Sequence, residues 1–358
     1  MTEQRAEGKG QRAEGGGQYM RSSDALVEGI RRVNRAPVIL ACVFALTLLA
    51  VLPFSMLMRN ALEVHLGNSM AADHAARGVN DQWWTEFSAQ AGPLGRTFST
   101  TIIGFAAVLD NLSALLDGES RTPAVLWPGA GYLGLWLFLS GGILDRYARA
   151  RPTQAYEFFA ACGSYFVRFL RLAPIIALTY YALFAYLHPV IFGNLYEEIT
   201  RDVTVERTAF LLRLALYVLF GSILVTASIV FDYAKVRAVV EDRRSMIGAL
   251  AAGVRFVRRN AGAVAMLYLL NGLMFAGVLV LYALVAPGAA SSGARVWLGF
   301  AVSQIYVLAR LWVRLVFFAS ETSLFQGRLA HAGYIAGASY KRPEPPVVER
   351  LVAPDSPW

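Results

Sequence analysis

Two arginines four residues apart, Arg310 and Arg314, lie inside an apolar stretch of the chain. A spacing of four places both side chains on one face of a helix. In the hydrocarbon interior of a membrane, each charge would cost about 2.5 kcal/mol or more unless it is paired. Three acids stand at the ends of apolar stretches, where they could meet the arginines: Asp145, Asp232 and Glu321. We therefore predict an intramembrane polar network around the two arginines.

Uncharged polar residues extend this candidate network. Asn271 and Gln304 lie within apolar stretches, and their amides can form hydrogen bonds between helices in a membrane. The network has two interpretations. It lines a substrate path or a gate, or it is a buried set of ion pairs that fixes the order of the helices, with Arg314 snorkelling toward the membrane interface.

No residue pattern in the sequence indicates catalysis or a bound cofactor. There is no glycine-rich phosphate loop, no nucleophile elbow and no Ser/His/Asp arrangement typical of hydrolases. His65 and His74 match no metal-ligand spacing, and Cys42 and Cys162 give no disulfide framework. We therefore expect no catalytic residue, no cofactor and no metal, in a protein that is not an enzyme.

The composition indicates a membrane protein. Of the 358 residues, 56% are apolar and only 16% are charged, which is too apolar for an ordinary soluble domain. A net charge of +8 can indicate nucleic-acid binding, but here the basic residues stand beside apolar stretches. That placement is typical of membrane topology and of contact with lipid headgroups. We expect membrane lipids as partners, and no nucleic acid.

Six apolar stretches, each near the ~20 residues that cross a bilayer core, must position the polar residues. They lie at about 36–58, 123–144, 172–192, 208–231, 261–286 and 296–320. The second is interrupted by Pro128 and five glycines, which suit close packing between membrane helices. The predicted fold class is all-α: a polytopic integral membrane protein with six transmembrane helices, in a membrane domain covering 22–328.

The distribution of basic residues predicts the orientation of these spans. If the N-terminus is inside, 23 of the 33 Lys and Arg residues fall on inner segments and 7 on outer segments. Basic residues concentrate on the cytoplasmic side of membrane proteins. Both termini are therefore expected in the cytoplasm.

The segments outside the spans differ in character. Residues 1–21 contain almost no apolar side chains and are expected to be disordered. The outer segment 59–122 is expected to be a helical insertion, with Trp83, Trp84 and Phe87 forming an aromatic patch suited to the membrane interface. Residues 102–116 within it are too short for a span and predict a re-entrant or interfacial helix. The tail at 329–358 is cytoplasmic and rich in proline near its end.

The sequence also contains a short internal repeat. Gly163-Ser-Tyr-Phe-Val-Arg168 matches Gly253-Val-Arg-Phe-Val-Arg258, and the stretch from Ala25 to Val33 matches the stretch from Ala249 to Val257. Each copy predicts an amphipathic interfacial helix that leads into an odd-numbered span, and each even-numbered span ends near an acid. We therefore predict three hairpin-like repeats.

This organisation, an interfacial helix with Gly-x-x-Phe-Val-Arg followed by a span, resembles bacterial six-span membrane proteins that share the plan of the membrane domain attached to some glycerophosphodiester phosphodiesterases. The resemblance implies the bacterial cytoplasmic (inner) membrane and no activity, because the phosphodiesterase domain is absent. We expect a non-enzymatic scaffold or accessory factor that binds a protein partner through 59–122 or the basic loop 232–260. The alternative is a transporter or permease subunit that uses the network around Arg310 and Arg314.

Overall fold

The computed structural model describes residues 20–67, 69–72, 74, 80–98, 104–119, 123–149, 152–286 and 293–329. Throughout these residues the regular structure is helical and contains no strand, which confirms the all-α class. The expected disordered segment 1–21 lies outside the described residues except for its last two. The expected tail 329–358 lies outside them except for its first residue.

The helices follow one another along the chain with short connections. The first part forms α1 (Ser22–Asn34), α2 (Pro37–Leu66), α4 (Asp81–Gln90), a 3₁₀ turn (Gly95–Thr97) and α5 (Gly104–Asp117). The middle part forms α6 (Pro123–Arg149), α7 (Ala155–Ala182), two π-helical segments (Leu183–Leu187 and Val190–Leu195), α8 (Tyr196–Thr200) and α9 (Glu206–Val240). The last part forms α10 (Met246–Arg259), α11 (Ala261–Val285) and α12 (Ala294–Arg328).

Five continuous helical segments among the described residues are long and apolar enough to cross a membrane. They are Pro37–Leu66, Ala155–Thr200, Glu206–Val240, Ala261–Val285 and Ala294–Arg328. The remaining expected span, 123–144, falls within α6, a helix of 27 residues that is not among these five. Its crossing stays a prediction.

The helices extend beyond the expected spans. α9 continues to Val240 and α12 to Arg328, although spans were expected to end at 231 and 320. These extensions are deeply buried, so tertiary packing holds them helical where hydropathy no longer does. α7 is likewise one helix from Ala155, with Pro174 inside it, so the second expected interfacial helix is continuous with its span.

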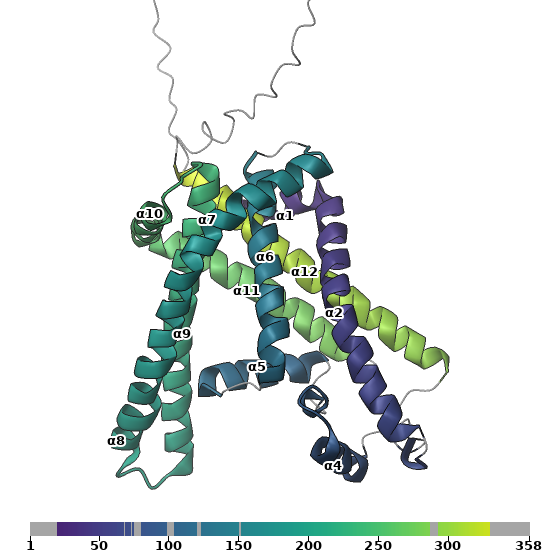
Figure 1. Cartoon of the computed structure of the whole chain (residues 1–358). Coiled ribbons are helices and arrows are strands. Elements are labelled where there is room, and N and C mark those ends of the chain that lie inside the picture. Colours follow the sequence, from purple (N-terminus) through teal and green to yellow (C-terminus); the bar gives the residue numbers. More distant parts are fainter. Residues whose placement is uncertain are drawn as a thin grey trace, which may run out of the picture.

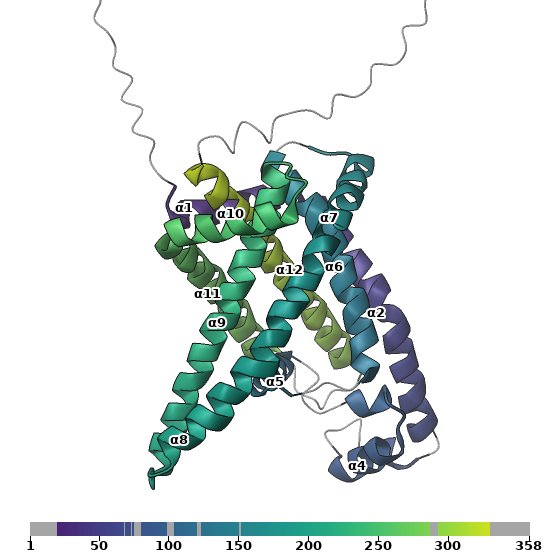
Figure 2. The same ribbon diagram turned by 60° about the vertical axis from the view of Figure 1, so that its left-hand side comes forward.

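Figures 1 and 2 show helices that converge at one end of the molecule and spread apart toward the other. We call the first the closed end: the C-terminal ends of α6, α9 and α12, with α1, α10 and the start of α7 around them. The opposite side is the open end. The buried core lies at the closed end, in 139–148 of α6, 229–240 of α9 and 311–325 of α12, whereas large apolar side chains are exposed along the rest of the helices.

Contacts at the closed end follow a regular scheme. α6, α9 and α12 contact one another in all three pairs, and around them α1 packs on α12, α7 on α6 and α10 on α9. Small residues permit this close approach. A Cβ added at Gly29 of α1 would lie 2.8 Å from the backbone nitrogen of Ser320 in α12. At Gly253 of α10, it would lie 3.1 Å from the backbone nitrogen of Ala234 in α9.

At the open end, α4 and α5 form small contacts of their own. Trp83 and Phe87 are buried and stacked on each other, and the Trp83 indole donates to Nδ1 of His65 at 3.0 Å. These two rings therefore form a small core against α2 rather than an exposed interfacial patch, because α2 continues to Leu66 and brings His65 to them. α5 lies between the spreading helices and contacts α9 and α11 (Figures 1 and 2).

Candidate functional site

The predicted polar residues gather partly along one face of α12. Arg310, Arg314, Phe317 and Glu321 follow one another at spacings of four, three and four, which places them on one side of the helix. We call these four residues the charged face of α12. Arg310 is 16 residues from the start of α12 at Ala294, which corresponds to about 24 Å of helix. The charged face therefore begins near the midpoint of α12 and leads into the buried closed end.

Arg314 is exposed but held by aromatic side chains of α6. Its guanidinium carbon lies 3.6 Å from the ring centroid of Trp136, a cation–π contact, and the Tyr132 hydroxyl is within hydrogen-bonding reach. Asp232 of α9 is close enough to interact with it electrostatically, but no ion pair joins them among the described residues. Stacking on Trp136 thus fixes the plane of the guanidinium without neutralising its charge.

Arg310 is exposed and forms no ion pair with any acid that the structure describes. It interacts electrostatically with Tyr306, whose ring is stacked on Tyr282 with 4.2 Å between centroids. Gln304 is half-buried, and its side chain makes no hydrogen bond within the described part of the chain. The structure therefore places Gln304 near Arg310 along the helix without joining the two.

At its other end, the charged face meets acids of α9 and a phenol of α11. Glu321 is 1% exposed, and the Tyr268 hydroxyl is within hydrogen-bonding reach of it. Asp232 forms an ion pair with Lys235 at 2.6 Å and accepts a hydrogen bond from Tyr268 at 3.1 Å. Oε2 of Glu321 has no hydrogen-bond partner among the described residues. Tyr268 thus connects two carboxylates that come from different helices.

The other two predicted residues lie apart from the arginines. Asn271 is fully buried, and its amide nitrogen donates to the Ser320 hydroxyl at 3.1 Å, which joins α11 to α12. Asp145 forms an ion pair with Arg149 one turn later on α6 at 2.8 Å. The predicted network is therefore divided: Asp232, Glu321 and Asn271 lie between α9, α11 and α12, the arginines stand further along α12, and Asp145 belongs to α6.

The charges around the charged face do not balance. Arg310, Arg314 and Lys235 supply three cations, and Asp232 and Glu321 supply at most two negative charges. Both oxygens of Asp232 already have partners, Lys235 and Tyr268. At least one positive charge, on the exposed part of α12, lacks a counter-charge among the described residues. Chemically, this arrangement can hold an anion; no group of His, Cys, Asp and Glu that could hold a metal ion occurs in the described part.

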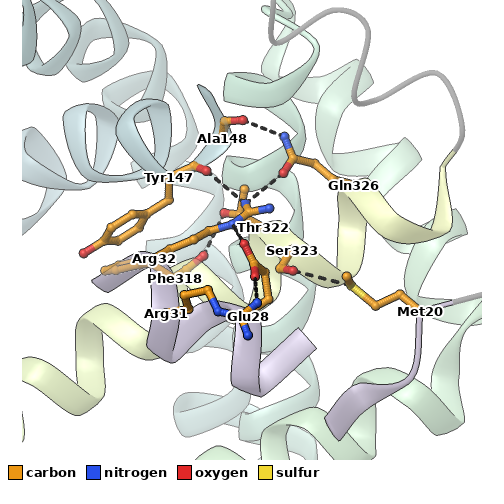
Figure 3. Close-up of polar contacts among 10 residues, drawn as sticks. All are labelled: Met20, Glu28, Arg31, Arg32, Tyr147, Ala148, Phe318, Thr322, Ser323 and Gln326. Atoms are coloured by element: carbon orange, nitrogen blue, oxygen red, sulfur yellow. Dashed lines mark hydrogen bonds and ion pairs between the residues drawn. The ribbon is translucent and has the colours of Figure 1, made fainter. Parts of the chain in front are cut away.

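A second polar cluster at the closed end joins α1, α6 and α12 (Figure 3). Nη1 of Arg32 donates to the Tyr147 carbonyl and to Oε1 of Gln326, both at 2.9 Å. Nε2 of Gln326 donates to the Ala148 carbonyl at 2.8 Å. The two side chains thus satisfy carbonyls at the end of α6, which otherwise lack helical partners. Glu28 pairs with Arg32 at 3.1 Å. Because each partner is engaged, this cluster fixes the helices rather than offering a binding site.

Sequence reasoning missed the aromatic partners of the site. Lys235 follows Asp232 by three residues, a spacing that indicates a neighbour on the same helix face and could have been noted. Trp136, Tyr132 and Tyr268 carry no such signal, because each reaches the charged face from another helix.

No protein-family model, curated protein or solved structure matches this chain, so its function must be inferred from its own geometry.

Proposed function

We propose that the protein is a six-span integral protein of the bacterial cytoplasmic membrane, with both termini and the closed end facing the cytoplasm. Five helices with the length and composition of spans support this topology. At 27 residues, α6 is about 40 Å long and exceeds a hydrocarbon core of about 30 Å. The excess of basic residues on the inner segments supports the orientation.

The three-repeat arrangement is part of this proposal, with α1 to α6, α7 to α9 and α10 to α12 as the copies. The contacts support it: the first helix of each copy packs on the last helix of another, α7 on α6, α10 on α9 and α1 on α12. Copies joined in this way form a closed ring in which every amphipathic helix has an equivalent neighbour.

Within this topology we propose a non-enzymatic scaffold or accessory factor that binds a protein partner at the closed end. The observation that carries this function is the basic groove on the outer side of α10, lined by Ala251, Val254, Arg255, Arg258 and Arg259. None of the three arginines forms an ion pair with an acid in the described part of the chain. α10 is held firmly on α9, so the groove is presented by a fixed surface.

In-cell photo-crosslinking tests this function. A photoreactive residue replacing Val254 should give a discrete crosslinked protein, and neutralising the groove arginines (Arg255→Gln, Arg258→Gln, Arg259→Gln) should abolish it. The same probe replacing Leu281, which is exposed on α11 outside the closed end, is the matched control. A crosslink pattern that is identical at both positions would overturn the scaffold function.

One observation favours the transport alternative: Arg310 and Arg314 are exposed on a predicted span without a described acidic partner. A cysteine replacing Arg310 should then react with a membrane-impermeant maleimide added to intact cells or to inverted vesicles. Failure to react from either side would exclude a water-filled path at this depth. The scaffold function does not require such a path.

A further inference from the structure

We propose that Arg310 and Arg314 hold the anionic headgroup of a membrane lipid, which enters from the bilayer beside α6 and α12. The inference rests on the proposed membrane topology. It names a ligand class, an anionic amphiphile with a phosphate or carboxylate group, for the part of the charged face that the protein leaves unneutralised.

The first support is the uncompensated charge. An exposed guanidinium near the middle of a span is unfavourable in hydrocarbon unless an anion accompanies it. The nearest described acid, Asp232, is already bonded to Lys235 and Tyr268, and Glu321 lies buried beyond Phe317. A ligand anion would therefore supply the negative charge that the described acids do not.

The second support is the geometry of the donors. Trp136 covers one face of the Arg314 guanidinium, and the Tyr132 hydroxyl is within hydrogen-bonding reach of its edge. The other N–H groups at that edge remain able to donate to a ligand. Arg310 lies one turn away, about 6 Å along the helix, so the two guanidinium groups can approach one phosphate from either side. Trp136 Nε1 and the Tyr306 hydroxyl beside them also lack hydrogen-bond partners among the described residues. The site thus has more donors than acceptors.

The third support is the apolar surface around the site, which selects an amphiphile over a soluble anion. Large apolar side chains are exposed on the open-end halves of α6 and α12, among them Leu133 and Phe300. Leu133 is three residues before Trp136 and Phe300 is fourteen residues before Arg314, spacings that place both on the side of their helix that faces the site. Acyl chains can cover such side chains while the headgroup meets the arginines. A small hydrated anion would have to leave water for this apolar surrounding, which costs free energy, whereas the headgroup of a lipid is already attached to acyl chains that favour it.

The test uses the full-length purified protein in detergent, exchanged against phosphatidylglycerol and phosphatidylcholine with identical acyl chains. Native mass spectrometry then counts the lipid that remains bound. The parent should retain phosphatidylglycerol in preference to phosphatidylcholine. The pair Arg310→Gln with Arg314→Gln should reduce this retention about tenfold or more, since hydrogen bonds to charged groups are lost. Arg207→Gln with Arg295→Gln, two exposed arginines outside the closed end, should leave it unchanged.

Further variants and a competing soluble anion complete the experiment. If the glutamine pair does not fold, Arg310→Lys with Arg314→Lys keeps both charges but not the planar donor groups, and it should show weakened retention. Equal retention by parent and folded variants, or equal loss in the control pair, would overturn the site. Displacement of the lipid by glycerol phosphate in solution would overturn its assignment to an amphiphile. Topology reporters at both termini test the six-span proposal separately. Failure of the topology is therefore distinguishable from failure of the lipid site.

Discussion

Replacing Gly29 by alanine probes one of the close helix contacts of the closed end, that between α1 and α12. Alanine favours a helix over glycine by about 0.5–1 kcal/mol, so at an unpacked position the substitution should stabilise. At Gly29, however, the new Cβ would lie 2.8–2.9 Å from backbone and side-chain atoms of Ser320. Contact at ordinary van der Waals distance requires α1 to move away by most of an ångström, and overpacking of this kind costs about 1–3 kcal/mol. The expected net effect is destabilisation by about 1 kcal/mol or somewhat more.

Gly163 provides the matched control, because it aligns with Gly29 in the predicted internal repeat. A Cβ at Gly163 meets no heavy atom within 4 Å. Gly163→Ala should therefore stabilise the protein by the gain in helix propensity alone. The difference in stability between the two variants then measures the effect of the close contact at Gly29. Thermal unfolding of both proteins in the same detergent, followed by loss of monodisperse protein, measures the difference. If Gly29→Ala unfolds at the same temperature as Gly163→Ala or above it, α1 does not pack on α12 as described.

Substitutions at three other residues test the polar contacts. Arg32→Met removes the bonds to Tyr147 and Gln326 and should increase hydrogen exchange in α1 but not in α4; unchanged exchange would contradict the bridging role. The Tyr217 hydroxyl holds the pKa of Asp117 below its ordinary 3.8. The contact between α5 and α9 should therefore be fully present above that value and be lost as the pH falls through the lowered pKa; hydrogen exchange of α5 should show this dependence, and Asp117→Asn should abolish it. Glu321→Gln should keep the bond to Tyr268 and lose no thermal stability, whereas Glu321→Ala should cost about 1–3 kcal/mol; a large loss in the glutamine variant would show that the protein needs this charge.

The sequence predicts the apolar helices well because hydropathy is a local property. The stretches at 208–231 and 296–320 carry enough apolar side chains to identify a span without any knowledge of its neighbours. The ends of α9 and α12 could not be predicted in the same way. They continue through polar residues to Val240 and Arg328 because other helices bury them, and burial depends on contacts between distant parts of the chain.

For the candidate site, too, the local features could be predicted from the sequence and the contacts between helices could not. That Arg310 and Arg314 share a helix face follows from their spacing, and so does the neighbourhood of Asp232 and Lys235. The stacking of Arg314 on Trp136 cannot be predicted from spacing, since it depends on how α6 crosses α12. The sequence likewise predicts α1 as an amphipathic interfacial helix but does not predict which helix it packs against. Gly29 of α1 packs against Ser320 of α12. This contact can be recognised only once the partner helix is known.

The packing of α1 on α12 has a consequence for how the protein is made. The bond between Arg32 and Gln326 joins residues 294 positions apart, so α1 finds its partner in the last helix that the structure describes. At about 5–20 residues per second, α1 waits roughly 15–60 s after its own synthesis before that partner exists. During this interval its small-residue surface is uncovered, and a chain that stops before α12 leaves it uncovered permanently.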